Sequence, residues 1–320
     1  MILVTGFNGF VGSSLLQLFK SIEGISARGT SRLKPSQSEK EIIYSGEIHR
    51  DTSWHKALKG CDTVIHTAAL THQMNTDLNK ESIEMYREIN TLGTINLAKQ
   101  AAKMGIKRFI FLSSIKVNGE STYNGQPFTA DDKPNPLDNY AISKYEAEIG
   151  LKEISKNTDM EIVIIRPSLI YGVGVKANFE ALIKFINKGF PLPFASIKNN
   201  KRSFVSLDNL NDLIIKCIDH PDAANQIFLV SDGSSLSTRK LVEKIAEAMS
   251  KKIKLINIPI SLLYLVAKLL GKEDAIIRLT GSLEVDITKT NDVLGWFPPF
   301  TVNEGLHRAC INFDNEKIIK

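Results

Sequence analysis

The sequence predicts an α/β protein in which a doubly wound parallel sheet is joined to a smaller α/β domain. Three observations predict it. Apolar runs alternate with helical stretches from Met1 to about Arg166, these runs are almost continuously apolar, and a glycine-rich turn follows the first of them. Such alternation predicts parallel strands linked by helices, and uninterrupted apolar strands indicate a sheet covered on both faces. The pattern is that of a Rossmann-type fold.

The expected strands are short apolar runs bounded by polar or glycine-containing segments. They span residues 1–5, 25–31, 41–44, 63–67, 108–113 and 161–166. Beyond Arg166 the alternation breaks. We expect residues 204–206 and the helical stretch 208–219 to return to the sheet, 226–230 to form a further strand, and 237–249 to form a capped amphipathic helix.

The first strand runs directly into a glycine-rich turn and then a helix. Gly6, Gly9 and Gly12 have the spacing G-x-x-G-x-x-G. In such a turn the first glycine permits a sharp bend, the second lets the backbone approach a pyrophosphate, and the third lets the helix pack on the strand. The helix N-terminus attracts the phosphate charge. We therefore expect a dinucleotide to bind at Gly6, Phe7, Asn8, Gly9, Phe10 and Val11.

The end of the second strand favours NADP over NAD, although NAD stays open. An NAD enzyme usually has an acidic residue about 20 residues past the glycine turn, which binds the ribose hydroxyls. This sequence has Arg32 there, with Arg28 close by. A guanidinium suits a 2′-phosphate instead.

Residues after the third and fourth strands complete the expected cofactor site. The segment after the third strand is expected to face the adenine, and small residues at the end of the fourth would let the cofactor lie across it. These residues are Glu47 and Ile48, then Thr67, Ala68 and Ala69.

Tyr140 and Lys144 are the strongest indication of chemistry. They lie four residues apart, so on a helix they share one face. A nearby cation favours the phenolate and lowers the pKa of a tyrosine, which then serves as a proton donor or acceptor near neutral pH. Ser114 would hydrogen-bond the same substrate oxygen. We expect Ser114, Tyr140 and Lys144 to be catalytic.

Composition and charge are ordinary for a globular protein. Hydrophobic residues make up 43% of the 320 residues, and 40 basic against 35 acidic residues give a net charge of +5. This small, dispersed excess does not support a nucleic-acid partner, but it permits an anionic substrate. Cys61, Cys217 and Cys310 are far apart, which predicts buried thiols in a reducing compartment. The six histidines have no metal-ligand spacing, so no metal site is expected.

No targeting segment is expected, because the first strand begins at Met1, and a cytoplasmic location is predicted. The most apolar tract, residues 258–270, is too short to span a bilayer. We expect it to form a buried helix of the second domain, with a membrane-surface or partner contact as the alternative.

Together these motifs resemble the extended short-chain dehydrogenase/reductase superfamily, in particular the NAD-dependent epimerase/dehydratase family. The resemblance implies that Lys144 binds the nicotinamide ribose, that Pro167 faces the nicotinamide, and that Asn90 holds backbone geometry or a water. It also implies a homodimer built on the helices around residues 90–103 and 140–155. The matching segments are residues 5–12, 66–69, 90–94, 113–114, 140–144, 166–167 and 171–172.

The second half resembles a bacterial nucleotide-sugar subgroup in segments 202–210, 228–233 and 281–286. This subgroup contains the 4-ketoreductases that form UDP-N-acetyl-quinovosamine. The resemblance implies NAD(P)H-dependent reduction of the 4-keto group of a UDP-linked 6-deoxy-N-acetyl hexose, for O-antigen and other lipopolysaccharide synthesis.

Three other functions are weighed against this one. The main alternative is a UDP-sugar 4-epimerase with tightly bound NAD, although Asn118-Gly119 stands where those enzymes tend to have Tyr-Gly. A cofactor-sensing protein without turnover would usually lack Tyr140 or Lys144. A hydroxysteroid dehydrogenase would need an apolar pocket in place of Arg202.

The substrate-binding residues are expected largely from the resemblance. A guanidinium binds phosphate oxygens in a bidentate way, so Arg202 is the leading diphosphate ligand. The other candidates are Arg278 for the diphosphate, Ser114 and Lys116 for the sugar, Asn178 and Phe179 for the diphosphate and uridine, and Leu192 and Phe194 for the uracil. The predicted domains are residues 1–170 with about 203–222 for the dinucleotide, and about 171–202 with 223–320 for the substrate.

Overall fold

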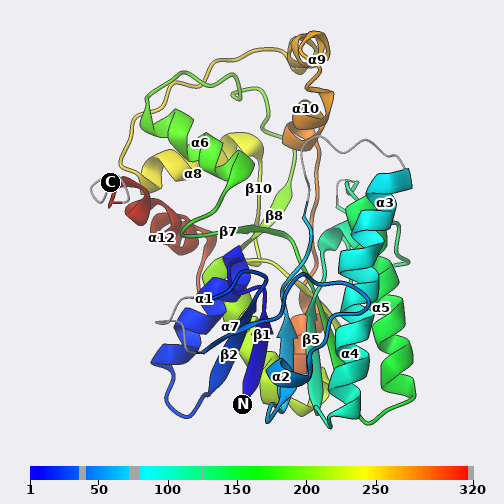
Figure 1. The fold of residues 1–320 in the computed structure, drawn as a ribbon. Coiled ribbons are helices and arrows are strands. Elements are labelled where there is room, and N and C mark those ends of the chain that lie inside the picture. The colour runs from blue at the N-terminus through cyan, green and yellow to red at the C-terminus, as the bar shows by residue number, and fades with distance from the viewer. Residues whose placement is uncertain (36–40, 72–79, 124, 316–320) are drawn as a thin grey trace.

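The computed structural model describes residues 1–35, 41–71, 80–123 and 125–315. Its main sheet has seven strands in the order β3-β2-β1-β4-β5-β6-β9, and every neighbouring pair is parallel. The predicted Rossmann-type sheet is therefore confirmed (Figure 1). The strands are β1 (Ile2–Thr5), β2 (Ala27–Ser31), β3 (Ile42–Tyr44), β4 (Thr63–His66), β5 (Arg108–Leu112), β6 (Glu161–Pro167) and β9 (Ile227–Val230).

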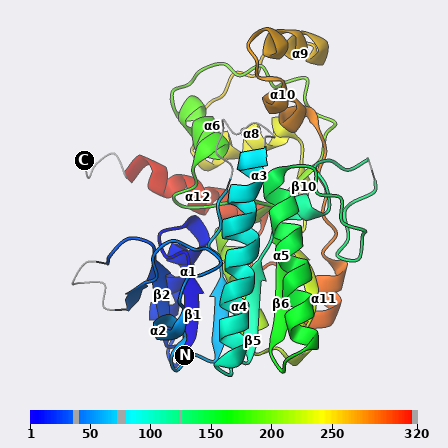
Figure 2. The same ribbon diagram turned by 45° about the vertical axis from the view of Figure 1, so that its right-hand side comes forward.

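Helices cover both faces of this sheet because successive strand residues point to opposite sides. Ile2 and Val4 of β1 pack into one core with α1 (Phe10–Ser21) and α7 (Leu207–Asp219), whereas Leu3 packs into a second core. That second core holds the inner faces of α2 (His55–Leu58), α4 (Gly93–Lys103) and α5 (Asn139–Lys156). Figure 2 shows α4 and α5 side by side in front of the sheet.

A second sheet of three strands, ordered β10-β8-β7, lies above the carboxyl ends of the main sheet (Figure 1). The prediction that residues 204–206 return to the main sheet is wrong, because β8 (Arg202–Ser206) pairs with β7 (Leu169–Tyr171) and β10 (Ser235–Leu236). The main sheet gains β9 instead. The short β8 packs Phe204 into a core with α6 (Ala177–Asn187), α8 (Thr238–Ala248) and α12 (Val302–Asn315).

A buried polar junction connects the two sheets. The Tyr171 hydroxyl donates to Asp232 Oδ2 at 2.7 Å. Asp232 Oδ1 accepts from the backbone N–H of Ser206 at 2.8 Å and from the Asn209 amide at 2.6 Å. Burial raises the pKa of Asp232 despite these hydrogen bonds. Since Asp232 follows β9, the junction fixes the second sheet relative to the first.

The remaining elements are α3 (Lys80–Tyr86), a π-helix (Arg87–Leu92), 3₁₀ turns at Ile115–Val117 and Pro221–Ala223, α9 (Ile260–Leu269), α10 (Glu273–Thr280) and α11 (Thr288–Leu294). The prediction that the tract around 258–270 forms a buried helix is wrong. A helix forms as α9, but none of its residues is buried, because it lies at the outer end of the molecule beside α10 (Figure 1). Within the described ranges, no helix combines the length and the apolar character needed to cross a bilayer.

The three cysteines, Cys61, Cys217 and Cys310, are buried and unbridged, as predicted. Cys217 lies on the buried face of α7, where burial raises the pKa of its thiol to about 12. A thiol in such surroundings stays protonated and unreactive.

Candidate active site

The glycine turn is packed backbone against backbone. Gly6 has φ +78°, and a Cβ added there would lie 2.9 Å from the backbone N and Cα of Ala68. A Cβ on Gly12 would lie 2.3 Å from the Gly6 carbonyl oxygen. The helix N-cap, Gly9, leaves the first N–H groups of α1 without a side-chain cap. Open N–H groups at a helix start, beside glycines that allow close approach, fit the pyrophosphate of a dinucleotide.

The end of β4 is locked onto the turn by a chain of hydrogen bonds. The Thr67 hydroxyl donates to the Thr5 carbonyl at 2.6 Å. His66 bridges the Thr5 hydroxyl through Nδ1 at 2.7 Å and the Thr94 hydroxyl through Nε2 at 2.8 Å. Burial, with a smaller effect of Lys144, lowers the pKa of His66 to about 3. A neutral His66 therefore holds the glycine turn, the end of β4 and α4 together. Sequence reasoning assigned no such role to it.

The structure separates the two arginines of the predicted 2′-phosphate site. Arg32 is exposed and directly follows the carboxyl end of β2. Arg28 lies nearer the other end, where its guanidinium donates to the Ala57 carbonyl at 3.5 Å. Only Arg32 of the two therefore stays a candidate for a phosphate at this edge. Glu47 is also exposed, and Ile48 packs against Gly93 at the start of α4.

Ser114, Tyr140 and Lys144 meet where β5 and α5 approach each other. Asp138 caps α5 by accepting from the Ala141 N–H at 2.7 Å, which places Tyr140 in the first turn. A hydrogen bond joins Tyr140 to Ser114. Ser114 in turn accepts from the Lys116 N–H at 3.2 Å, at the start of a 3₁₀ turn. The structure thus brings together a serine and a tyrosine predicted to share one substrate oxygen.

Burial dominates the electrostatics of this group. Lys144 is 1% exposed, with Nζ 4.1 Å from the Phe111 ring centroid. Burial lowers the pKa of Lys144 to about 7, although Glu148 opposes this. Burial also raises the pKa of Tyr140, and Asp138 adds to the effect while Ser114 opposes it. The low tyrosine pKa expected from the sequence is therefore absent from the protein alone, because burial of Tyr140 and the nearby Asp138 charge both favour the neutral phenol.

Sequence reasoning missed the buried network beneath these residues. Glu148 lies four residues after Lys144, just as Lys144 lies four residues after Tyr140, so the three share one face of α5. This spacing is the sequence pattern that could have indicated a role for Glu148. Its carboxylate accepts from the Ser113 hydroxyl at 2.6 Å and from Arg166 at 2.9 and 2.5 Å. Arg166 also donates to the Asn118 side-chain oxygen at 2.9 Å. The network fixes α5 against the carboxyl ends of β5 and β6.

Asn90 lies in the π-helix between α3 and α4, a deviation often found at functional sites. Its amide accepts from the Leu70 N–H at 2.8 Å and donates to the Leu70 carbonyl at 3.0 Å and the Ser143 hydroxyl at 3.0 Å. Asn90 therefore fixes the loop after Ala69 and the residue preceding Lys144. Pro167 ends β6, where the backbone of Ser168 bonds the Val230 carbonyl at 3.1 Å.

Charged residues gather around the start of β8, whose first residue is Arg202. Arg202 donates to the carbonyls of Arg278 at 2.9 Å and Gly281 at 3.3 Å. Burial and the neighbouring Arg278 charge lower the pKa of Arg202, which indicates two cations close together. The charge of Lys116, in contrast, is neutralised by two carboxylates, because Lys116 contacts Glu120 at 2.9 Å and Asp138 at 2.5 Å. The arginine pair is thus the better match to an anionic group.

The other predicted substrate residues lie mainly in the core that the second sheet forms with α6, α8 and α12. Phe179 is buried and stacks on Tyr171 with ring centroids 5.4 Å apart. Leu192 is also buried, and Phe194 packs partly against the same core. Their side chains therefore contribute to this core. The side chain of Asn178 lies outside the described part of the structure.

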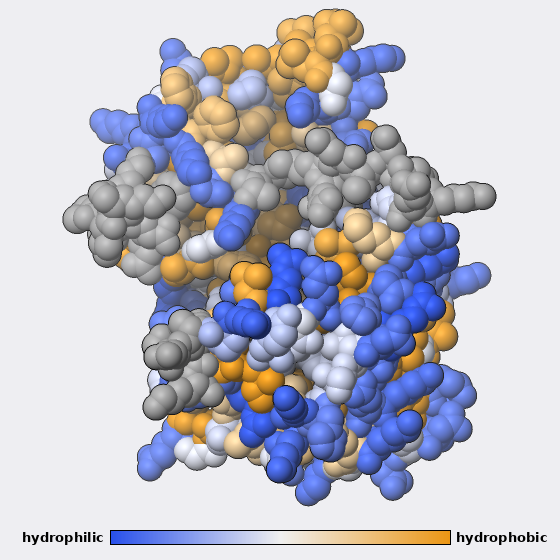
Figure 3. Space-filling model, in the orientation of Figure 1, coloured by the Kyte–Doolittle hydropathy of each residue, from blue (hydrophilic) through white to orange (hydrophobic). Residues whose placement is uncertain are grey.

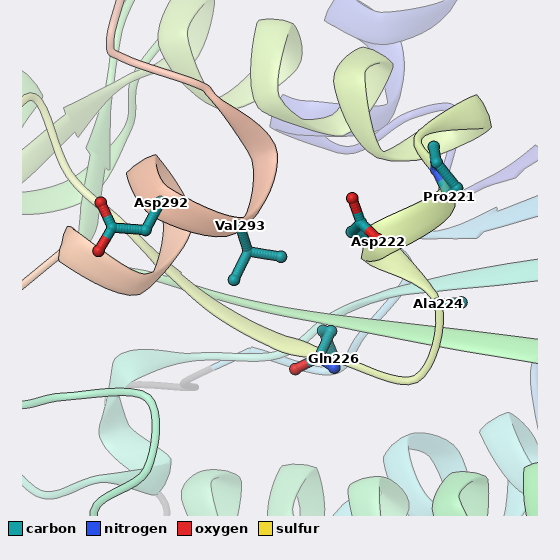
Figure 4. A pocket seen from close by; sticks show the side chains of 6 residues that line it. All are labelled: Pro221, Asp222, Ala224, Gln226, Asp292 and Val293. Atoms are coloured by element: carbon teal, nitrogen blue, oxygen red, sulfur yellow. The ribbon is translucent and has the colours of Figure 1, made fainter.

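A surface pocket of about 520 Å³ lies away from these residues (Figure 4). It opens beside Gln226, just before β9, and so at the amino-terminal edge of the sheet. The glycine turn and Ser114 follow the carboxyl ends of β1 and β5, at the opposite edge. The pocket is lined by Pro221, Asp222, Ala224, Gln226, Asp292 and Val293.

Known proteins resemble this chain in sequence and in fold. Over 312 residues the chain is 47% identical to a UDP-glucose 4-epimerase of Vibrio cholerae, covering 98% of this chain and 95% of the relative. Among solved structures, MoeE5 in complex with UDP-glucuronic acid and NAD has a TM-score of 0.77 at 21% identity, covering 98% of this chain and 99% of its own. RMD from Pseudomonas aeruginosa, complexed with NADPH, has a TM-score of 0.74 at 20% identity, with coverage of 98% and 99%.

The likeness to these two solved structures supports the Rossmann-type fold. The family assignment rests on a more direct match, since the model of the NAD dependent epimerase/dehydratase family matches residues 2–231. This range includes the glycine turn, Ser114, Tyr140 and Lys144. The chain belongs to the NAD dependent epimerase/dehydratase family.

Proposed function

We propose that the protein is a UDP-sugar 4-epimerase that retains its NAD through the catalytic cycle. The observation that carries the proposal is the 47% identity to the Vibrio cholerae UDP-glucose 4-epimerase over nearly the full length of both chains. The 4-ketoreductase predicted from sequence becomes the second candidate. It is favoured by Arg32, which follows β2 where an acidic residue would be expected for NAD.

The chain's own residues would hold the cofactor and move one proton. The glycine turn and the N-terminus of α1 would receive the pyrophosphate, and Lys144 would contact the nicotinamide ribose. When bound, the nicotinamide supplies the oxidising and reducing chemistry at the sugar C4. Tyr140 would take the proton of the C4 hydroxyl and return it to the C4 oxygen. Ser114, hydrogen-bonded to Tyr140, would bind that oxygen and orient it.

The arginine pair would bind the substrate diphosphate. Arg202 is held by two carbonyl groups and faces a second cation, Arg278, so an incoming diphosphate would relieve their repulsion. Lys116 already has carboxylate partners at 2.9 and 2.5 Å, and we assign it to orienting Asp138 and the start of α5.

The two candidate functions differ in whether the enzyme consumes added cofactor. An epimerase purified without added nucleotide should convert UDP-glucose to UDP-galactose, followed by proton NMR, and should release NAD on denaturation. A reductase should instead oxidise NADPH stoichiometrically when given UDP-4-keto-6-deoxy-N-acetylglucosamine, followed at the nicotinamide absorbance. Tyr140→Phe is the control for both assays. Cofactor-dependent reduction without any epimerisation of UDP-glucose or UDP-N-acetylglucosamine would overturn the epimerase proposal.

A further inference from the structure

Helix α9 presents an apolar face with no partner in the described structure. Leu262, Leu265, Val266 and Leu269 have the i, i+3, i+4, i+7 spacing that places them on one face of a helix. They are between 46% and 79% exposed. Tyr264 instead hydrogen-bonds Thr280 of α10 at 2.9 Å. We call these four residues the apolar stripe of α9. A soluble protein normally buries such a stripe, so its exposure points to a binding surface.

The apolar stripe lies at one extremity of the molecule. Figure 1 shows α9 beyond α6 and α8, at the end of the second domain opposite the main sheet. In Figure 3, hydrophobic side chains gather at that same end. Residues 256, 270 and 277, all apolar, are also exposed there or in the adjoining elements, at 39%, 68% and 52%. The stripe therefore lies among other exposed apolar side chains at this end of the molecule.

The charge around the stripe indicates which kind of partner fits. Residues 250–274 contain five lysines and two acidic residues, Glu273 and Asp274, so the segment carries three net positive charges. The five lysines are Lys251, Lys252, Lys254, Lys268 and Lys272, and all are exposed. A second copy of the chain, docked through the same face, would bring identical lysines against each other. An anionic apolar surface would satisfy both the stripe and the lysines.

We propose that the apolar stripe of α9 and these lysines dock the protein on the surface of a bilayer that contains anionic phospholipid. With ten residues, α9 is about 15 Å long, so it would lie within the interface and not span the bilayer. The leucines would enter the boundary between headgroups and acyl chains. Each lysine near an anionic leaflet strengthens binding about fivefold. Because α10 carries Arg278, the docked face would adjoin the proposed diphosphate-binding pair.

Vesicle cosedimentation of the full-length protein tests this proposal. The wild type should sediment with vesicles of equal parts phosphatidylcholine and phosphatidylglycerol, much less with phosphatidylcholine alone, and less again at high salt because salt screens the lysines. Combining Leu265→Ser with Leu269→Ser should weaken binding roughly tenfold or more, since each buried leucine contributes strongly. Combining Lys268→Glu with Lys272→Glu should weaken it about 25-fold or more.

Matched controls distinguish vesicle binding through this surface from nonspecific adsorption to vesicles. Phe297→Ser removes an aromatic side chain that is 67% exposed elsewhere, and Lys59→Glu with Lys103→Glu reverses two exposed charges at the far end of the main sheet. Both should bind vesicles like the wild type. All variants should retain their circular dichroism spectrum and their turnover of soluble UDP-sugar. Equal binding by the α9 variants and the wild type would overturn the proposal. So would self-association that the leucine variant abolishes while vesicles bind none of the proteins.

Discussion

Arg166 donates two hydrogen bonds to Glu148, at 2.9 and 2.5 Å, in a place where the two side chains are 1% and 0% exposed. The pair ties the strand β6 to the helix α5. Glu148 lies one helical turn from Lys144 and two turns from Tyr140, so the same contact fixes the face that carries both. A buried ion pair of this kind costs desolvation and contributes little net stability. Its evident effect here is to position Tyr140 and Lys144.

Breaking this pair should strongly destabilise the protein. Arg166→Met leaves the Glu148 carboxylate buried without its cation, which typically costs about 3–5 kcal/mol. Chemical denaturation of the single variant, and of Arg166→Met combined with Glu148→Leu, measures the cost and its recovery. The exposed pair Arg239–Glu243 gives the matched control, because Arg239→Ala should cost less than about 1 kcal/mol. Equal losses in Arg166→Met and Arg239→Ala would contradict the assignment.

Lys144 should make the stability of the cofactor-free protein depend on pH. Burial lowers its folded-state pKa from 10.5 to about 7. Between these values the unfolded chain carries a proton that the native state lacks, so the free energy of unfolding should rise with pH from about 7 to 9. The slope for one proton is about 1.4 kcal/mol per pH unit. Denaturation midpoints of Lys144→Met should lack this rise, and an identical rise in both proteins would assign it to other groups.

The positions of the glycine turn and of the Tyr140–Lys144 pair could be predicted because the parts of each are local in sequence. Gly6, Gly9 and Gly12 lie in one turn, and Tyr140 and Lys144 lie in one helix, so spacing alone brings each set together. The main sheet could be predicted for the same reason, because a parallel sheet requires apolar strands that alternate with helices along the chain. The observed limits of the strands differ from the predicted limits by one or two residues, which is the usual uncertainty at the ends of such elements.

The remaining features depend on contacts between distant segments. Pairing of β8 with β7 and β10 joins residues far apart, and no local pattern distinguishes it from a return to the main sheet. The Glu148–Arg166 pair likewise needs the tertiary fold. The exposure of α9 could not be predicted either, because an apolar tract carries the same pattern whether it packs on its own chain or on another surface. Phe179 and Leu192 were expected to contact substrate on the family resemblance, which gives a position along the chain but not the burial of a side chain, and both side chains pack in the core.

Arg32 should determine the preference between the two nicotinamide dinucleotides. Arg32→Asp exchanges a phosphate partner for an acceptor of ribose hydroxyls, so NADP should bind more weakly and NAD as well or better. Fluorescence titration of the cofactor-free protein gives both affinities. Arg28→Gln is the control, because its guanidinium bonds the Ala57 carbonyl near the other end of the strand. An affinity ratio unchanged by Arg32→Asp would show that Arg32 does not contact the 2′-phosphate.

Removing the Tyr140 hydroxyl should stop turnover without disturbing the fold. Tyr140→Phe keeps the ring, whose centroid lies 6.4 Å from that of Tyr86, and deletes the group that would move the proton. General acid–base catalysis contributes roughly 10²–10⁴-fold, so kcat should fall by that factor while cofactor affinity and thermal stability are kept. Tyr86→Phe serves as the comparison and should retain most activity. Activity of Tyr140→Phe within a few-fold of the wild type would remove Tyr140 from the mechanism.

Arg202 should contribute more to substrate binding than to cofactor binding. Its guanidinium faces the Arg278 charge, and a charge-assisted hydrogen bond to phosphate contributes about 1.5–3 kcal/mol. Arg202→Ala should therefore raise KM for the UDP-sugar roughly 10–100-fold, with NAD affinity unchanged. Inhibition by UDP alone should weaken in parallel, because UDP keeps the diphosphate and lacks the sugar. Arg202→Lys separates charge from geometry: it keeps the cation but loses the two-pronged contact, so it should recover only part of the affinity. If UDP inhibits the wild type and Arg202→Ala equally, the diphosphate binds elsewhere, and Arg278→Ala becomes the next variant to measure.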